Sequence, residues 1–555
     1  MEAPITRTCE RFTVVLTLAL VAAAGPAFSA IPLSTYVEAR AAEMDGDEIR
    51  SARLFAAMAT ADPADRTIAR RAIATAIQSG QSELAVSLAK TVPPNELPID
   101  ARLMLAADSL RRNKPKDAIA VLEKGVTSTE IDLFAPLVKA WERTARGKED
   151  GVEMLSQMSA ASPLAPIANE QKAAMLFALG KADEGLVFAR KALIQSGTGG
   201  RNVRLRLAYA DSLLKAKRRE DALSMLQGDD DALVAARARV AAGKPLDMAL
   251  DTPAAGFAEM LIALAVDLGR DDNKALPIAL AQVARHANPS NSESSILLGL
   301  LLDGDKRSDD ALTLLRAVPA DDLLVGEALD VETRILTDRG QHAAALSRAR
   351  SATTTPTAGS QDYGRLANVL GDMDRHAEAA DAYGQAIERT KAKGGQPSWT
   401  LHLLRAASLE QADRWGEAKA ELETAMKVEP DNALLLNFLG YGKLERGEDL
   451  DVAEAMIRKA SALRPDDASI TDSLGWALYK RGRLPEAIET LSKAAAGDPA
   501  QSEIHEHLGD ALFASGRRIE ARFSWQAAAI TAEGKAKSRI QSKMEAGLSP
   551  ANAAP

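Results

Sequence analysis

The side chains best suited to bind a metal stand close together near the C-terminal end of the sequence. His505, Glu506 and His507 offer two imidazoles and a carboxylate, which are common ligands of zinc. Residues i and i+2 of a helix point about 200° apart, so the two imidazoles cannot converge on one ion. The other four histidines are far apart in the sequence. We therefore predict no metal site.

A run of glycines at 197–200 is the segment most similar to a phosphate-binding loop. It reads Gly-Thr-Gly-Gly and lacks both the lysine and the preceding strand that such a loop requires. The sequence also contains no GxxxxGK[ST], HExxH or GxSxG pattern. We expect a loop between helices at this point, no cofactor and no enzymatic activity.

Residues 1–29 have the features of a secretory signal. Basic residues precede the apolar run Phe12–Ala24, and Ala27-Phe28-Ser29 fits a small-x-small cleavage pattern. The run is too short to span a bilayer comfortably. Cys9, the only cysteine, precedes the run, whereas a lipidated cysteine would follow it. We predict an exported, periplasmic protein that is not a lipoprotein and keeps no transmembrane anchor after cleavage. The alternative is an uncleaved anchor.

The composition indicates an extended helical protein. The chain has 555 residues, too many for one compact core, and aromatic residues make up only 4%. Alanine and leucine are abundant, which favours helices that pack closely through small side chains. The net charge is −9 and no basic stripe is visible before the short C-terminal tail, which argues against nucleic acid, so we expect no nucleic-acid partner.

Three residue types recur with the same period in the C-terminal part of the chain. The spacings are 34 or 35 residues in each of the series Gly440, Gly475 and Gly509; Ala418, Ala453, Ala487 and Ala521; and Pro430, Pro465 and Pro499. A period near 34 with small residues inside and proline at the boundary is typical of stacked helical hairpins.

One period illustrates the predicted hairpin. Asp466-Asp467 offers an N-cap for a first helix over Ser469–Lys480, and Gly482 ends that helix because glycine adopts the left-handed C-cap conformation readily. Pro485 fits the first turn of a second helix over Glu486–Ala496. The recurring glycines and alanines are packing residues where the two helices approach closely.

This pattern resembles the tetratricopeptide repeat (TPR). The unit that starts at Ala468 matches the family at Leu474, Gly475, Leu478, Ala487, Leu491, Ala494 and Pro499. The resemblance implies an all-α fold, a right-handed α-solenoid of antiparallel helix pairs, in which the N-terminal half of this chain is degenerate.

The same resemblance suggests how the whole chain is divided. We predict a signal peptide at 1–29, a degenerate helical array at 30–355, about five repeats at 360–533, and a capping helix with a disordered tail at 534–555. The Ser/Thr/Pro/Gly-rich stretch at 351–360 is the predicted boundary between the two arrays.

In TPR proteins the first helix of each repeat lines a concave groove that binds peptides. Carried over by register, the groove residues here are Asn437, Tyr441, Asp472, Trp476, Tyr479, Lys480, Glu506 and Asp510, with Glu445 and Glu503 beside them. Carboxylates predominate, so we predict a basic or aliphatic–basic partner segment. The alternative is that Trp476 and Tyr479 are partly buried between repeats. In the groove interpretation, Asp472→Lys with Trp476→Ala abolishes partner capture and leaves helicity intact.

The chain as a whole resembles the exported TPR proteins of Gram-negative bacteria. That resemblance implies a non-catalytic periplasmic scaffold or adaptor that binds segments of partner proteins, in cell-envelope assembly or proteolysis. The alternatives are a polysaccharide-export or peptidoglycan-associated envelope factor and an enzyme with its site within 30–355. The sequence carries no indication of the oligomeric state.

Overall fold

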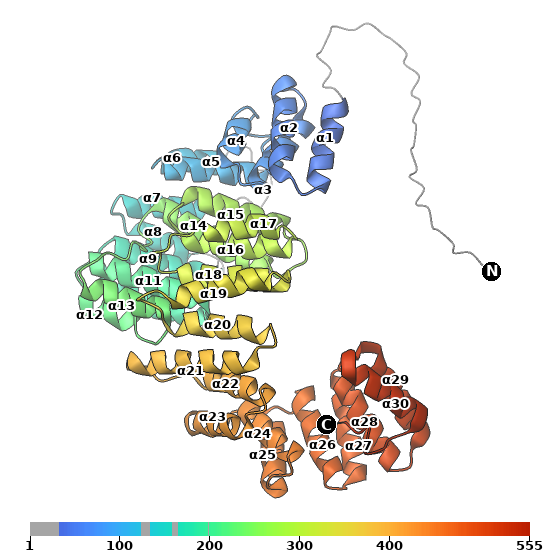
Figure 1. Ribbon diagram of the computed structural model, residues 1–555. Helices are drawn as coiled ribbons and strands as arrows, with labels where there is room; N and C mark the ends of the chain where they lie inside the picture. The colour runs from blue at the N-terminus through green and yellow to red at the C-terminus, as the bar shows by residue number, and fades with distance from the viewer. Residues whose placement is uncertain (1–32, 124–133, 158–164, 198, 555) are drawn as a thin grey trace, which may run out of the picture. The chain divides into compact units, whose positions relative to one another are not determined.

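The computed structural model describes residues 33–123, 134–157, 165–197 and 199–554, and these ranges are helical without any β-strand. They contain thirty α-helices, most of which form antiparallel hairpins through short turns (Figure 1). The fold is therefore the predicted all-α solenoid of helix pairs. Within the described ranges, no helix combines the length and the hydropathy that a membrane span needs. The predicted signal and Cys9 lie outside these ranges.

The helices divide between two compact units, and the division does not follow the order of the chain. Unit 1 comprises α1 (Leu33–Met44), α2 (Glu48–Ala61), α3 (Arg66–Gln78), α4 (Ser82–Ala89), α5 (Ile99–Arg111), α6 (Pro115–Glu123), α7 (Phe134–Ala145), α14 (Pro253–Leu268) and α15 (Ala275–Ala287).

Unit 2 holds the remaining helices. They are α8 (Asp150–Ser156), α9 (Ala168–Ala178) with the short 3₁₀ turn Ala165–Ile167 before it, α10 (Ala182–Gln195), α11 (Gly200–Lys215), α12 (Arg219–Met225), α13 (Asp231–Ala241), α16 (Ser292–Gly304), α17 (Ser308–Arg316), α18 (Val325–Asp338), α19 (His342–Thr353), α20 (Ser360–Gly371), α21 (His376–Ala392), α22 (Trp399–Gln411), α23 (Trp415–Val428), α24 (Ala433–Glu445), α25 (Leu450–Leu463), α26 (Ala468–Lys480), α27 (Leu484–Gly497), α28 (Ser502–Ala514), α29 (Arg518–Thr531) and α30 (Gly534–Ala546).

In unit 1, helices α14 and α15 return to elements much earlier in the chain. α14 packs against α7, where the Trp141 ring is buried directly under Gly256. A Cβ added at Gly256 would lie 2.1 Å from the Trp141 Nε1, so only glycine fits this contact. α15 packs on α3 and α5, and Gln78 Nε2 donates to the carbonyl of Ala275 over 2.6 Å. This non-sequential packing is not visible in the repeat period.

In unit 2, the hairpin of α26 and α27 shows why the local sequence folds this way. Asp467 caps α26 by accepting from the amide of Ile470 at 3.1 Å. Gly482 follows the helix with φ of +74°, and the amide of Arg483 donates back to the carbonyl of Leu478 at 2.9 Å. Both helices lie within two residues of the ranges predicted from the sequence.

The C-terminal end of the chain differs from the predicted disordered tail. Asn552 and Ala554 are buried, and the Asn552 amide group donates to the carbonyl of Gly547 at 2.9 Å. The predicted boundary at 351–360 also does not coincide with the division of the fold, because α19 and α20 on either side of it belong to the same unit.

Candidate functional site

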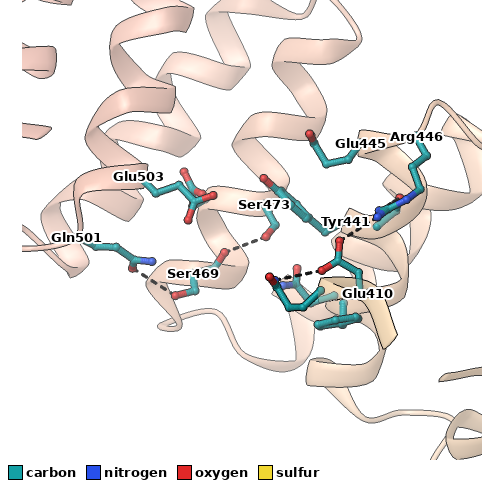
Figure 2. Close-up of a pocket in the computed structure, with 13 residues that line it drawn as sticks. Glu410, Tyr441, Glu445, Arg446, Ser469, Ser473, Gln501 and Glu503 are labelled. Atoms are coloured by element: carbon teal, nitrogen blue, oxygen red, sulfur yellow. Dashed lines mark hydrogen bonds and ion pairs between the residues drawn. The ribbon is translucent and has the colours of Figure 1, made fainter. Parts of the chain in front are cut away.

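The first helices of four successive hairpins enclose a cavity of about 630 Å³ in unit 2. Helices α22, α24, α26 and α28 each contribute to its wall. In Figure 2, Glu410 and Arg446 lie on one side of the cavity, and Gln501 and Glu503 lie on the other. The cavity therefore lies on the surface that the repeat register predicts as the groove, and three of the eight predicted residues, Asn437, Tyr441 and Asp472, line it.

Negative charge predominates in this cavity. Its lining includes four carboxylates, those of Glu410, Glu445, Asp472 and Glu503. Arg446 is the one cation among the described lining residues, and it pairs with Glu410 at 2.9 Å. The charges of Arg446 and Glu410 thus neutralise each other within the wall. Asp472 lies 2.9 Å from His507 and Glu445 lies 3.7 Å from Lys480, so Glu503 is the lining carboxylate that forms no ion pair within the described residues.

Two neutral side chains of α24 line the cavity. Burial raises the pKa of Tyr441, and the carboxylates of Glu445, Glu503 and Asp472 raise it further, so its hydroxyl stays protonated and hydrogen-bonds to Glu503. Asn437 Oδ1 is buried and makes no hydrogen bond within the described chain. A buried acceptor without a partner is costly, and an N–H group of a ligand would satisfy it.

Trp476, predicted as a groove anchor, is instead a core residue. Its side chain is 1% exposed, and its Nε1 donates to Glu445 at 2.8 Å. The ring stacks between Tyr479, with centroids 4.6 Å apart, and His507, with centroids 4.0 Å apart. His507 comes from the next hairpin and covers one face of the ring. The two predicted alternatives for Trp476 were a position in the groove and burial between repeats. The structure shows burial.

Lys480 is exposed at the end of α26 and does not line the cavity. Its Nζ lies 3.7 Å from Glu445 and 5.0 Å from the centroid of the Trp476 ring. It therefore contributes to the edge of the stacked cluster rather than to a binding surface.

Glu506 and Asp510, predicted as groove carboxylates, are buried under α30. Lys543 is fully buried and its Nζ lies 2.6 Å from Glu506 and 2.7 Å from Asp510. Arg539 also donates twice to Glu506 at 2.7 Å. Both carboxylates are therefore neutralised within the chain and add no negative charge to the groove.

These ion pairs repeat at the spacing of the hairpins, which sequence reasoning missed. His507 Nδ1 lies 2.9 Å from Asp472, 35 residues earlier, and Lys543 pairs with Glu506, 37 residues earlier. Asp472 and Glu506 occupy the same position in consecutive repeats. The sequence feature that could have predicted these pairs is a basic residue about one repeat after an acidic residue.

His505 and His507, which were predicted not to share a metal ion, contact different partners. His505 Nε2 lies 3.1 Å from the carbonyl of Pro499, whereas His507 contacts Asp472. Across the described residues, no three potential ligands converge on a point.

A second acidic cavity of about 520 Å³ lies between α13, α18 and α20 of unit 2. Glu327 lines it, and burial raises the pKa of its carboxyl to about 7, with Asp230, Asp330 and Asp322 adding to the shift. The folded state therefore favours the protonated carboxyl.

We expect Glu327→Gln to stabilise unit 2 in a pH-dependent manner. Because the folded pKa is raised, the protonated carboxyl stabilises the fold fully below about pH 4.5, and this contribution is lost as pH rises through about 7. The free energy of unfolding of the variant should equal that of the wild type at pH 4.5 and exceed it above pH 7 by on the order of 1–3 kcal/mol. Urea unfolding across this pH range measures the difference, and an equal effect at both ends would contradict the shift.

Comparison with known proteins supports the repeat assignment. Residues 475–516 match the family model described as TPR repeat. No curated protein matches the chain in sequence.

Several solved structures are similar to the chain. A tetratricopeptide repeat protein from Parabacteroides merdae is 14% identical, with 46% of this chain and 97% of that chain covered and a TM-score of 0.38. The Cut9–Hcn1 assembly of APC/C is 13% identical over 93% and 96%, with a TM-score of 0.37. Yeast Tom70 is 12% identical over 93% and 95%, with a TM-score of 0.36.

The TM-scores are all below 0.5, so the assignment relies on the matched repeat and on the hairpins themselves. The glycine and alanine period, the capped hairpins of α20 to α29 and the match at 475–516 agree with one another. The chain therefore contains a TPR repeat at 475–516, within a series of similarly built helical hairpins.

Proposed function

We propose that this protein is a non-catalytic periplasmic scaffold that holds a basic or aliphatic–basic segment of a partner protein in the cavity between α22 and α28. A TPR fold suggests a protein-binding scaffold in general terms. The charge of the cavity supports the finer proposal, because Glu503 forms no ion pair within the described residues and a segment that carries lysine or arginine can supply one, beside the further lining carboxylates Glu410, Glu445 and Asp472.

Asn437 supports binding of a peptide rather than of a free cation. Its buried Oδ1 has no partner in the described chain and can accept from a backbone N–H of an extended segment. Recognition would then combine backbone hydrogen bonds with one or two basic side chains.

The proposed location depends on the first 29 residues, which have the features of a secretory signal. In the periplasm, a scaffold of this kind would serve cell-envelope assembly or proteolysis. Fusion of residues 1–40 to a reporter that is active only after export tests the location separately from the binding site.

We expect Glu503→Lys to weaken binding of a basic peptide about tenfold or more, because it places a cation in the acidic cavity. Glu503 is exposed at its rim, so the fold should tolerate the change. The matched control is Glu489→Lys, which makes the same change on an exposed position of α27 away from the cavity.

The probe is a fluorescein-labelled 12-residue peptide with lysines in one half and alanines in the other, followed by fluorescence anisotropy at several salt concentrations. Asn437→Ala should weaken binding without changing the salt dependence, because it removes a neutral acceptor. Equal affinities for Glu503→Lys, Glu489→Lys and the wild type would overturn the proposed groove. As a separate test of the proposed groove, a photo-crosslinking residue at Gln411, a further cavity position, is expected to capture partner segments that carry lysine or arginine.

A further inference from the structure

The last described residues of the chain lie on the same concave surface as the cavity. Ala554 is buried in a cluster with Leu444 of α24 and Trp476 of α26, and Tyr441 and Tyr479 pack against this cluster. Figure 1 shows the C-terminus next to α26. Tyr441 also lines the cavity, so the segment and the cavity share a boundary.

Ala554 of the segment at 549–554 contacts residues that adjoin the cavity but do not line it. The amide of Ala554 donates to Asp510 Oδ2 at 3.2 Å, and its methyl group packs in the apolar cluster around Trp476. One main-chain hydrogen bond and one small side chain in a pocket are the elements of peptide recognition on a protein groove.

The rest of the segment is braced against α30 and not against the groove. Asn552 Nδ2 donates to the carbonyl of Gly547 at 2.9 Å and to Ser542 Oγ at 3.2 Å, and its Oδ1 accepts from the amide of Ser549 at 2.7 Å. These bonds shape a turn that presents Ala554 to Asp510. The contact with the groove itself is therefore small, and a competing ligand can replace it.

We propose that segment 549–554 is an intrachain competitor that covers the surface adjoining one end of the cavity, and that partner segments carry small apolar residues beside their basic residues. This inference rests on the proposed function and deepens it. The intrachain tether supports even a weak contact, since short tethers give effective concentrations on the order of millimolar. The covered end accommodates an alanine methyl, so it selects small residues, while the open cavity selects the basic ones.

Ala554→Glu tests the competition in the full-length chain, because it places a carboxylate in an apolar cluster next to Asp510 and should expel the segment. Ala553→Glu is the matched control, because it makes the same change at the exposed neighbouring residue. If the segment is in place nine-tenths of the time, its release should tighten binding of the lysine–alanine peptide about tenfold. The control should bind like the wild type.

The composition of the probe separates the two ends of the groove. A second peptide that has glutamines in place of the alanine half should show no gain in the Ala554→Glu variant. Hydrogen exchange of 549–554 reports whether the segment is released, and a chain ended after Leu548 removes it while α30 remains. An unchanged affinity for the lysine–alanine peptide in that shortened chain would overturn the competition. Failure of every variant, including the wild type, to bind either peptide would instead overturn the proposed function.

Discussion

Replacing Trp476 by alanine should unfold the last hairpins instead of removing a contact with a partner. The indole is 1% exposed, stacks between Tyr479 and His507, and donates a hydrogen bond to Glu445. Truncation of a buried tryptophan to alanine removes this packing and leaves a cavity, at a cost of about 3–5 kcal/mol. We expect a corresponding fall in the urea midpoint of unit 2, measured by circular dichroism.

The conservative variant Trp476→Phe distinguishes packing from hydrogen bonding. It keeps an aromatic ring in the stack but loses the donor to Glu445 and part of the buried indole volume, so it should cost less than alanine, about 1–2 kcal/mol. A urea midpoint for Trp476→Ala as high as that of the wild type would contradict the buried position of the Trp476 ring. The double variant Asp472→Lys with Trp476→Ala is unsuitable as a test of the groove, because it also breaks the contact of Asp472 with His507.

Substitution of Gly475 by valine is expected to have the second largest effect on stability. A Cβ at this position would lie 2.5 Å from Leu491 Cγ and 3.1 Å from the Leu491 backbone nitrogen. The backbone of α27 cannot move away cheaply, so α26 and α27 would separate, at a cost of about 1–3 kcal/mol. Thermal unfolding of the full chain measures the loss.

Gly364→Val is the matched control for this prediction. Gly364 also lies in the first helix of a hairpin, α20, but a Cβ there has no heavy atom within 4 Å. The same substitution should therefore change stability by no more than about 0.5 kcal/mol. If both variants lost equal stability, close approach of the two helices would not explain the recurring glycines.

The hairpins could be predicted from the sequence because their signals are local. Caps such as Asp467 and Gly482 act within one turn of the chain, and the glycine–alanine period reports contacts between two helices of one hairpin. The register derived from them also placed Asn437, Tyr441 and Asp472 on the wall of the cavity.

The errors concern contacts between hairpins. Whether Trp476 faces solvent depends on His507 of the next hairpin, and the charge of Asp510 depends on Lys543 in α30. A register assigns each side chain to a face of its helix, but it does not say what covers that face. The role of Glu410 was also missed, since the register was extended to only three repeats.

The return of α14 and α15 to unit 1 has a consequence for how the protein is made. Helices α8 to α13 of unit 2 leave the ribosome before unit 1 has received its last two helices. At about 5–20 residues per second, the residues between the ends of α7 and α15 take roughly 7–30 s to synthesise. Through that interval the Trp141 ring lacks the helix that covers it, so the nascent chain presents an apolar surface that a chaperone can shield. Expression of either half of the chain alone would make this interval permanent.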